Sequence, residues 1–180
     1  MSTAENLEAI LAEMRGVFAR MPADAVPQLA REIANAHRVL VYGVGRTGLV
    51  LQAFAMRLMH LGLDGHYVGQ LSAPPIRKGD LLLTTLAVGR LPTADALIGS
   101  AKAAGARIVA ISARPELVQG ADVAIPLPAQ TMADPLTSIL PLGSPFEVAL
   151  ALLCDLTVVE LMAILGRSNA DLAARHANLL

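Results

Sequence analysis

Short, continuously apolar runs alternate with longer segments of helical spacing through the middle of the chain. Runs of this kind are typical of strands buried on both faces of a sheet. The predicted strands are residues 38–42, 66–68, 80–85, 107–112 and 123–125. Helical spacing is present at 49–59 and at 93–104. This order favours an α/β domain with a parallel sheet covered on both faces, which binds ligands at the carboxyl ends of its strands.

Helices are also predicted on either side of this α/β pattern. The first covers Leu7 to Phe18 with Thr3 as its cap, and the second covers residues 28–36. We therefore assign residues 1–37 to packing or oligomer contacts and residues 38–180 to the main domain.

Beyond the last strand, residues 126–145 hold five of the eleven prolines and show little periodicity. A segment of this length without regular structure is usually functional or a lid. A long apolar helix is predicted from Phe146 to Leu165, and a final helix from Asn169 to His176.

Composition excludes several classes of protein. Hydrophobic residues make up 54% of the 180 residues and charged residues 16%, which excludes intrinsic disorder. The net charge of -1 and the absence of Trp argue against a nucleic-acid partner. The single cysteine, Cys154, excludes an internal disulfide and a multi-cysteine zinc site, and indicates a cytoplasmic protein.

The apolar stretch from Phe146 to Leu165 approaches the length of a membrane span, but Glu147, Asp155 and Glu160 interrupt it. A central Asp costs roughly 2.5–3.5 kcal/mol on insertion scales. We therefore expect no membrane partner and interpret this stretch as a helix buried in protein. The high apolar fraction also predicts self-association.

The segment from Gly43 to Gly48 reads G-V-G-R-T-G, follows a predicted strand and opens a helix. It matches the dinucleotide fingerprint, but the second strand ends Val68-Gly69-Gln70 without the acidic residue that would hold a ribose. A nicotinamide or flavin cofactor is therefore not expected.

The same loop is suited to a smaller anion. Gly43, Gly45 and Gly48 allow the backbone to approach a ligand, and the start of the helix supplies free N–H groups. Arg46 adds a cation and Thr47 a hydroxyl, which suits a phosphate monoester. The alternative is a tight turn whose glycines serve only packing.

Five segments together resemble the sugar isomerase (SIS) domain family, and within it the 6-phospho-3-hexuloisomerases. They read VLVYGVGRTGLVLQAFAMRLMHLG, KGDLLL, AKAAGARIVAIS, PLGSPFE and RHANL. The resemblance implies a single SIS-type domain with a five-stranded parallel sheet between helices, a flavodoxin-like three-layer sandwich. It also implies a homotetramer, or a dimer, with active sites at subunit contacts.

The activity implied by the resemblance interconverts 3-hexulose 6-phosphate and fructose 6-phosphate through an enediol, without cofactor or metal. This reaction belongs to formaldehyde assimilation through ribulose monophosphate, or to its reversal. The partner would be a small-molecule sugar phosphate.

One segment departs from the family pattern. A second phosphate loop of the form Ser-Gly-Ser-Gly-Glu-Thr is usual, whereas this chain has Leu86-Ala-Val-Gly-Arg90-Leu91. Apolar side chains therefore stand where the family pattern has the hydroxyl groups of serine and threonine, and the loss of these hydrogen-bond donors is expected to weaken phosphate binding. Either Arg90 and the first loop, with Thr85 nearby, hold the phosphate, or the ligand differs. Alternatively, Leu86 and Val88 pack against a neighbouring subunit.

Moving a carbonyl between adjacent carbons requires a base and a proton shuttle. Glu147 is the candidate base: it begins an apolar helix after a Pro-rich loop, and it matches the glutamate of the family motif. Stabilisation of the helix start is the alternative role. His176 in RHANL and His60 in RLMHLG match the family and are the candidate shuttles, with a favourable dipole contact as the alternative for His60.

Two other functions stay open at this point. The altered loop is compatible with a non-catalytic sugar-phosphate-binding SIS protein, which would act through a partner. It is also compatible with an isomerase of a different acidic sugar, whose carboxylate would meet Arg90.

Overall fold

The computed structural model describes residues 2–179. Residue 1 of the predicted range 1–37 and residue 180 of the predicted range 38–180 lie outside the described residues. The helices are α1 (Thr3–Ala19), α2 (Ala25–Ala34), α3 (Gly45–His60), α4 (Pro92–Ala103), α5 (Ser144–Leu165) and α6 (Asn169–Ala173). The strands are β1 (Val39–Tyr42), β2 (Gly65–Tyr67), β3 (Leu81–Thr85), β4 (Arg107–Ser112) and β5 (Val123–Pro126), with a short 3-10 helix, η1 (Pro115–Leu117).

The five strands form one parallel sheet in the order β2-β1-β3-β4-β5. The predicted α/β fold is therefore confirmed. β2 lies beside one edge of β1, and the next strand along the chain, β3, lies beside the opposite edge of β1. The direction in which strands are added to the sheet therefore reverses between β1 and β3. Loops on either side of such a point diverge and leave room for a ligand at the carboxyl ends of the strands.

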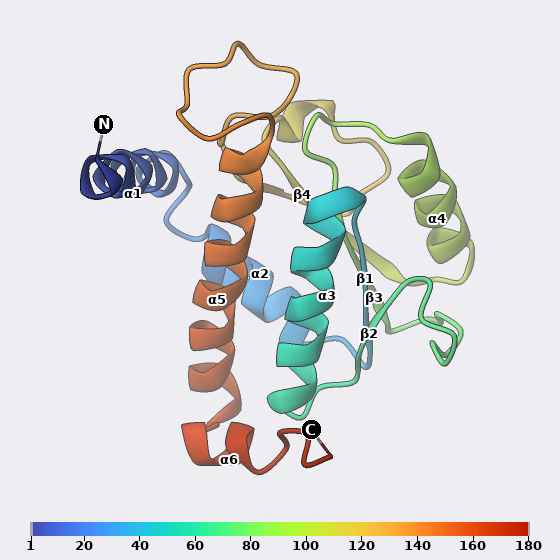
Figure 1. Cartoon of the computed structure of the whole chain (residues 1–180). Coiled ribbons are helices and arrows are strands. Elements are labelled where there is room, and N and C mark those ends of the chain that lie inside the picture. The colour runs from blue at the N-terminus through green and yellow to red at the C-terminus, as the bar shows by residue number, and fades with distance from the viewer. Residues whose placement is uncertain (1, 180) are drawn as a thin grey trace.

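The apolar runs are continuous because both faces of the sheet are covered. Val39 and Val41 of β1 belong to the core beneath α2, α3 and α5, whereas Leu40 belongs to the core beneath α4. The same alternation holds in β3, where Leu82 faces α4. Figure 1 shows α2, α3 and α5 on one side of the sheet and α4 on the other. A strand between two such layers needs apolar side chains at every position.

α5 is the longest helix and is the one helix among the described residues that is long and apolar enough to cross a membrane. Here it is a core helix on one side: Phe146, Leu150 and Leu153 are fully buried against the rest of the domain. The prediction of a buried helix is therefore only partly correct, because its other side exposes Leu152, Leu156, Val159 and Ile164.

Three predicted helix ends were wrong. Ser2, not Thr3, caps α1: its side chain accepts from the Glu5 amide, and the Glu5 carboxylate accepts from the Ser2 amide. α2 begins at Ala25 and includes Pro27 in its first turn, where the missing N–H costs nothing. α6 ends at Ala173, three residues before His176.

Candidate functional site

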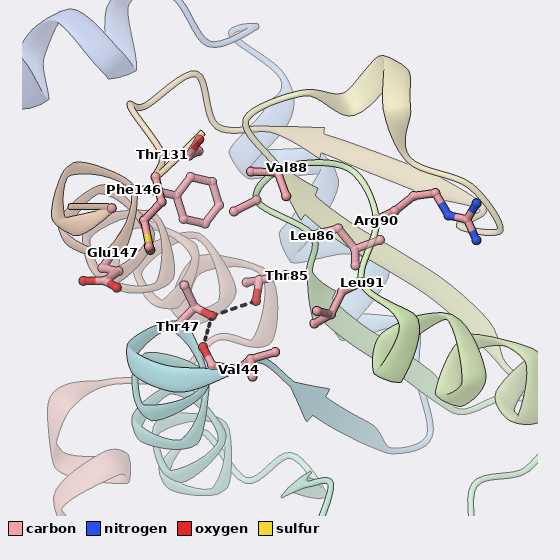
Figure 2. A pocket seen from close by; sticks show the side chains of 13 residues that line it. Val44, Thr47, Thr85, Leu86, Val88, Arg90, Leu91, Thr131, Phe146 and Glu147 are labelled. Carbon is pink, nitrogen blue, oxygen red and sulfur yellow. Dashed lines mark hydrogen bonds between the residues drawn. The ribbon is translucent and has the colours of Figure 1, made fainter. Parts of the chain in front are cut away.

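A cavity of about 270 Å³ lies at the carboxyl ends of β1 and β3, where the strand order reverses (Figure 2). Its walls come from the start of α3, the segment after β3, the 127–143 loop and the start of α5. The lining residues are Val44, Thr47, Thr85, Leu86, Ala87, Val88, Arg90, Leu91, Thr131, Met132, Gly143, Phe146 and Glu147. Position and lining together make it the candidate active site.

Close backbone contact explains the glycines of the loop after β1. A Cβ on Gly48 would lie 2.4 Å from the Gly43 carbonyl oxygen, and a Cβ on Gly43 would lie 2.9 Å from the Thr85 hydroxyl. Gly45 has a φ of +58°, a conformation that other residues rarely adopt. The turn also begins α3, whose first amides have no acceptor within the helix, and its Thr47 lines the cavity. The glycines therefore have a packing role, and the anion site remains a prediction. We refer to the first turn of α3 together with Thr85 as the cradle.

Two threonine hydroxyls join the two sides of this cradle. Thr85 Oγ1 donates to Thr47 Oγ1 at 3.1 Å, and Thr47 Oγ1 donates to the Val44 carbonyl at 2.8 Å (Figure 2). Thr85 is buried at the end of β3, whereas Thr47 lies in the first turn of α3. Both can turn toward a ligand oxygen, so the structure brings these two predicted residues together.

Glu147 lies in the first turn of α5 at the edge of the cavity, with 18% of its side chain exposed. Its Oε2 atom lies 2.9 Å from Nε of Arg46, but the two groups are not aligned for a hydrogen bond. Within residues 2–179, this buried oxygen has no hydrogen-bond partner. Glu147 therefore lines the same cavity as Thr47 and Thr85, with its carboxylate in an ion pair with Arg46.

Arg46 is turned toward α5 and is not among the lining residues. Its Nη1 donates to Ser144 Oγ at 3.1 Å, beside the contact with Glu147. The cation predicted for the anion site therefore sits between the start of α3 and the start of α5.

The segment after β3 is apolar toward the cavity, as its sequence predicts. Leu86 is buried in the chain's own core under α4 and is not available to a neighbouring subunit, whereas Val88 is exposed, so for Val88 that alternative stays a prediction. Arg90 pairs with Asp95 in the first turn of α4, at 3.2 Å through Nε and 2.8 Å through Nη2. Figure 2 shows its guanidinium directed away from Thr47 and Thr85. The nearby carboxylate thus holds this cation outside the cradle.

Another wall of the cavity is the proline-rich loop of residues 127–143, which is fixed by hydrogen bonds to the Asp134 carboxylate. This carboxylate accepts from the Thr131 amide at 2.7 Å, from the Thr131 hydroxyl at 2.8 Å and from Arg114 at 2.6 Å. The two Thr131 bonds, followed by Arg114, lower the pKa of Asp134. Thr131 and Met132 are thereby fixed in the cavity wall. The sequence predicts a functional loop here but does not single out Thr131 and Met132. The Thr-x-x-Asp spacing of Thr131 and Asp134 is the local signal for the hydrogen bonds that fix them.

His60 and His176 do not lie in this cavity. α3 has 16 residues, so His60 at its last position is more than 20 Å from Gly45 at its first, at about 1.5 Å per residue. The two imidazole rings stack on each other with centroids 5.2 Å apart. Burial first, and then Arg57 and His176, lower the pKa of His60. A neutral His60 gains little from the helix dipole, which argues against that alternative.

The stability of the protein is expected to fall on acidification because of His60. Its pKa lies below 6.5 in the folded chain, so protons bind the unfolded chain more readily below that pH. The free energy of unfolding should be constant above about pH 7.5 and fall toward pH 5.5. Urea unfolding at both values tests this, with His60→Gln expected to show a smaller fall and the exposed His37→Gln the wild-type fall. An equal fall in wild type and His60→Gln contradicts the assignment.

No protein-family model matches the chain. Over 99% of its length it is 33% identical to a 3-hexulose-6-phosphate isomerase from Bacillus subtilis (strain 168), of which it covers 100%. The chain belongs to the 3-hexulose-6-phosphate isomerase family. A family member from Mycobacterium gastri is 36% identical, with 97% of this chain and 89% of that protein covered.

A solved structure supports the same family. It is a hypothetical protein from Methanococcus jannaschii, whose crystal structure is described as inferring a 3-hexulose-6-phosphate isomerase function. The TM-score is 0.85 at 30% identity, with 98% of this chain and 99% of that chain covered. These relatives bear the other name of the 6-phospho-3-hexuloisomerases, so the predicted resemblance to that family is confirmed. The predicted SIS-type fold is confirmed as well.

Proposed function

We propose that this protein interconverts 3-hexulose 6-phosphate and fructose 6-phosphate, with Glu147 as the base and the start of α3 as the phosphate site. One observation carries this proposal beyond the family assignment. Glu147, Thr47 and Thr85 line one cavity at the strand-order reversal. A phosphate at the start of α3 would leave the carbon chain of the sugar within the cavity that Glu147 also lines.

The phosphate would be bound by neutral donors. The amides of Gly45, Arg46 and Thr47 are at the positive end of α3, and the hydroxyls of Thr47 and Thr85 add two further donors. Thr85, at the end of β3, supplies a hydroxyl beside the apolar 86–91 segment. Gly43 and Gly48 keep the turn compact enough for all of these donors to face one side.

The reaction moves one proton between adjacent carbons. Glu147 would remove the proton from C2 of 3-hexulose 6-phosphate, which gives an enediol across C2 and C3, and would return it to C3. The hydroxyl on C2 loses its proton as the new carbonyl forms, and the oxygen on C3 gains one. No electron acceptor is needed, so the proposal includes neither a cofactor nor a metal.

The proton between the two oxygens would be carried by His176 or His60 of another copy. In its own chain each lies at the far end of α3 from the cavity, so either would serve a neighbouring site; His176 is exposed, whereas His60 is buried and stacks against it. A groove of about 280 Å³ lies between α3 and α5, and both helices carry exposed apolar side chains. These are Leu49, Met56, Met59, Leu152, Leu156 and Val159. We propose that copies meet on this face, as a homotetramer or a dimer.

We also propose that the protein acts in the cytoplasm, in formaldehyde assimilation through ribulose monophosphate or its reversal, because its relatives include 3-hexulose-6-phosphate isomerases. The alternative of an acidic sugar bound by Arg90 has less support, because Asp95 already pairs with that side chain.

An assay with 3-hexulose 6-phosphate tests the proposed function. The purified protein should form fructose 6-phosphate, detected by a coupled dehydrogenase, and should leave the unphosphorylated ketose largely unchanged. Binding of the phosphosugar without turnover would instead support a non-catalytic binding protein. Turnover of a sugar acid in preference to the phosphosugar would overturn the phosphate assignment.

A further inference from the structure

Arg46 occupies a position between the two functional parts of the proposed site. It is the second residue of α3, in the same turn whose amides form the phosphate cradle. Its guanidinium, however, contacts α5, through Glu147 and Ser144 in the first turn of that helix. One side chain therefore connects the proposed phosphate site to the proposed base.

The contacts of this side chain are easily exchanged. The Arg46 side chain is 64% exposed, and its approach to Glu147 is an ion pair without hydrogen-bond alignment. Only the arginine half of this pair is exposed, since 18% of the Glu147 side chain is accessible, and the contact lacks the directional hydrogen bonds of a strong ion pair. A phosphate group on the cradle offers the same guanidinium a dianion and two parallel hydrogen bonds, which is a stronger interaction. Phosphate binding can therefore draw Arg46 away from Glu147.

The departure of Arg46 changes what Glu147 can do. The Arg46 guanidinium lies 2.9 Å from Oε2 of Glu147, so it occupies the side of the carboxylate that has no hydrogen-bond partner among residues 2–179. In Figure 2 the Glu147 carboxylate points away from Thr47 and Thr85, which is away from the sugar that the cradle would hold. A carboxylate without this partner can turn into the cavity and accept a proton.

We propose that Arg46 is a positioning residue that couples occupancy of the phosphate site to release of the base. Paired with Glu147 and Ser144, it keeps the carboxylate at the start of α5, and a bound phosphate transfers Arg46 to the cradle and frees the carboxylate. The inference rests on the proposed function and adds a regulatory contact to that site. It makes the substrate's own phosphate an activator, in addition to an anchor.

The coupling can be tested by supplying the sugar and the dianion as two separate molecules. Unphosphorylated 3-hexulose is the substrate, and inorganic phosphite is added to occupy the phosphate site. Phosphite should raise wild-type turnover of the ketose by roughly 5- to 150-fold, the range typical of coupling between two sites. Arg46→Met should turn over the ketose faster than wild type without phosphite, and should lose the activation. Arg46→Lys should restore part of it.

A matched control uses another arginine–carboxylate pair. Arg107 binds Glu32 through two hydrogen bonds at the amino end of β4, which is the opposite end of the strands from the cavity. Arg107→Met should therefore keep the wild-type response to phosphite. Activation that is absent in wild type, or unchanged in Arg46→Met, overturns the coupling even if 3-hexulose 6-phosphate is isomerised. Failure to isomerise 3-hexulose 6-phosphate at all overturns the proposed function instead.

Discussion

Glu147→Gln is expected to lower the turnover of fructose 6-phosphate by about 10²- to 10⁴-fold, the contribution typical of a positioned general base. The amide has nearly the same shape as the carboxylate but cannot accept the carbon-bound proton. α5 should still form, because Phe146 and Leu150 beside it provide the buried surface that fixes its first turns. Steady-state kinetics, with KM and kcat determined separately, measures the effect.

A control on the same helix separates chemistry from helix stability. Glu160→Gln also removes a carboxylate from α5, but far along the helix from the cavity. It should leave kcat unchanged, and thermal unfolding should give similar midpoints for both variants. A Glu147→Gln enzyme with near-normal kcat would remove Glu147 from the mechanism.

Gly48→Ala is expected to destabilise the chain and to disrupt the phosphate cradle together. The added Cβ would lie 2.4 Å from the Gly43 carbonyl oxygen, and a backbone atom cannot move aside as a side-chain end can. Overpacking typically costs about 1–3 kcal/mol, which lowers Tm by roughly 2–4 °C per kcal/mol in a chain of this size. Affinity for fructose 6-phosphate should fall as well, because the first amides of α3 would be displaced.

Gly99→Ala is the matched control for this substitution. Gly99 lies within α4, and a Cβ there would have no heavy atom within 4 Å. Alanine in an open helical position should stabilise the protein by about 0.5–1 kcal/mol. Calorimetry and equilibrium binding on both variants test the pair. Equal Tm values for Gly48→Ala and wild type would show that the contact between the loop and the helix is not tight.

The sheet could be predicted because its strands satisfy a strict local requirement. Leu40 and Leu82 face one helical layer while Val39 and Val41 face the other, so consecutive positions in these strands are apolar and the runs are visible in the sequence. Helix ends depend on finer competition between neighbours. Ser2 and Thr3 are both good capping residues, and the reach of Glu5 back to the Ser2 amide decides between them.

The site could be predicted only in part, for reasons of distance in space. The glycine loop and Glu147 carry local signals, but the bond between Thr47 and Thr85 depends on the packing of β3 beside β1. The position of Arg90 was in principle accessible, since Asp95 is five residues away in the first turn of α4. The separation of His60 from the cradle follows from the length of α3. The helical spacing in the sequence covers only residues 49–59, so it does not define where this helix begins.

Solvent deuterium exchange with fructose 6-phosphate tests the central claim most directly, because it reports proton removal by the site itself. In D₂O, Glu147 would remove the proton from C3 and return a deuteron there, so NMR should show deuterium at C3 of the recovered fructose 6-phosphate and none at C1. The Glu147→Gln protein should leave C3 protonated. Wild-type protein that binds fructose 6-phosphate yet introduces no deuterium at C3 and forms no 3-hexulose 6-phosphate would contradict the account.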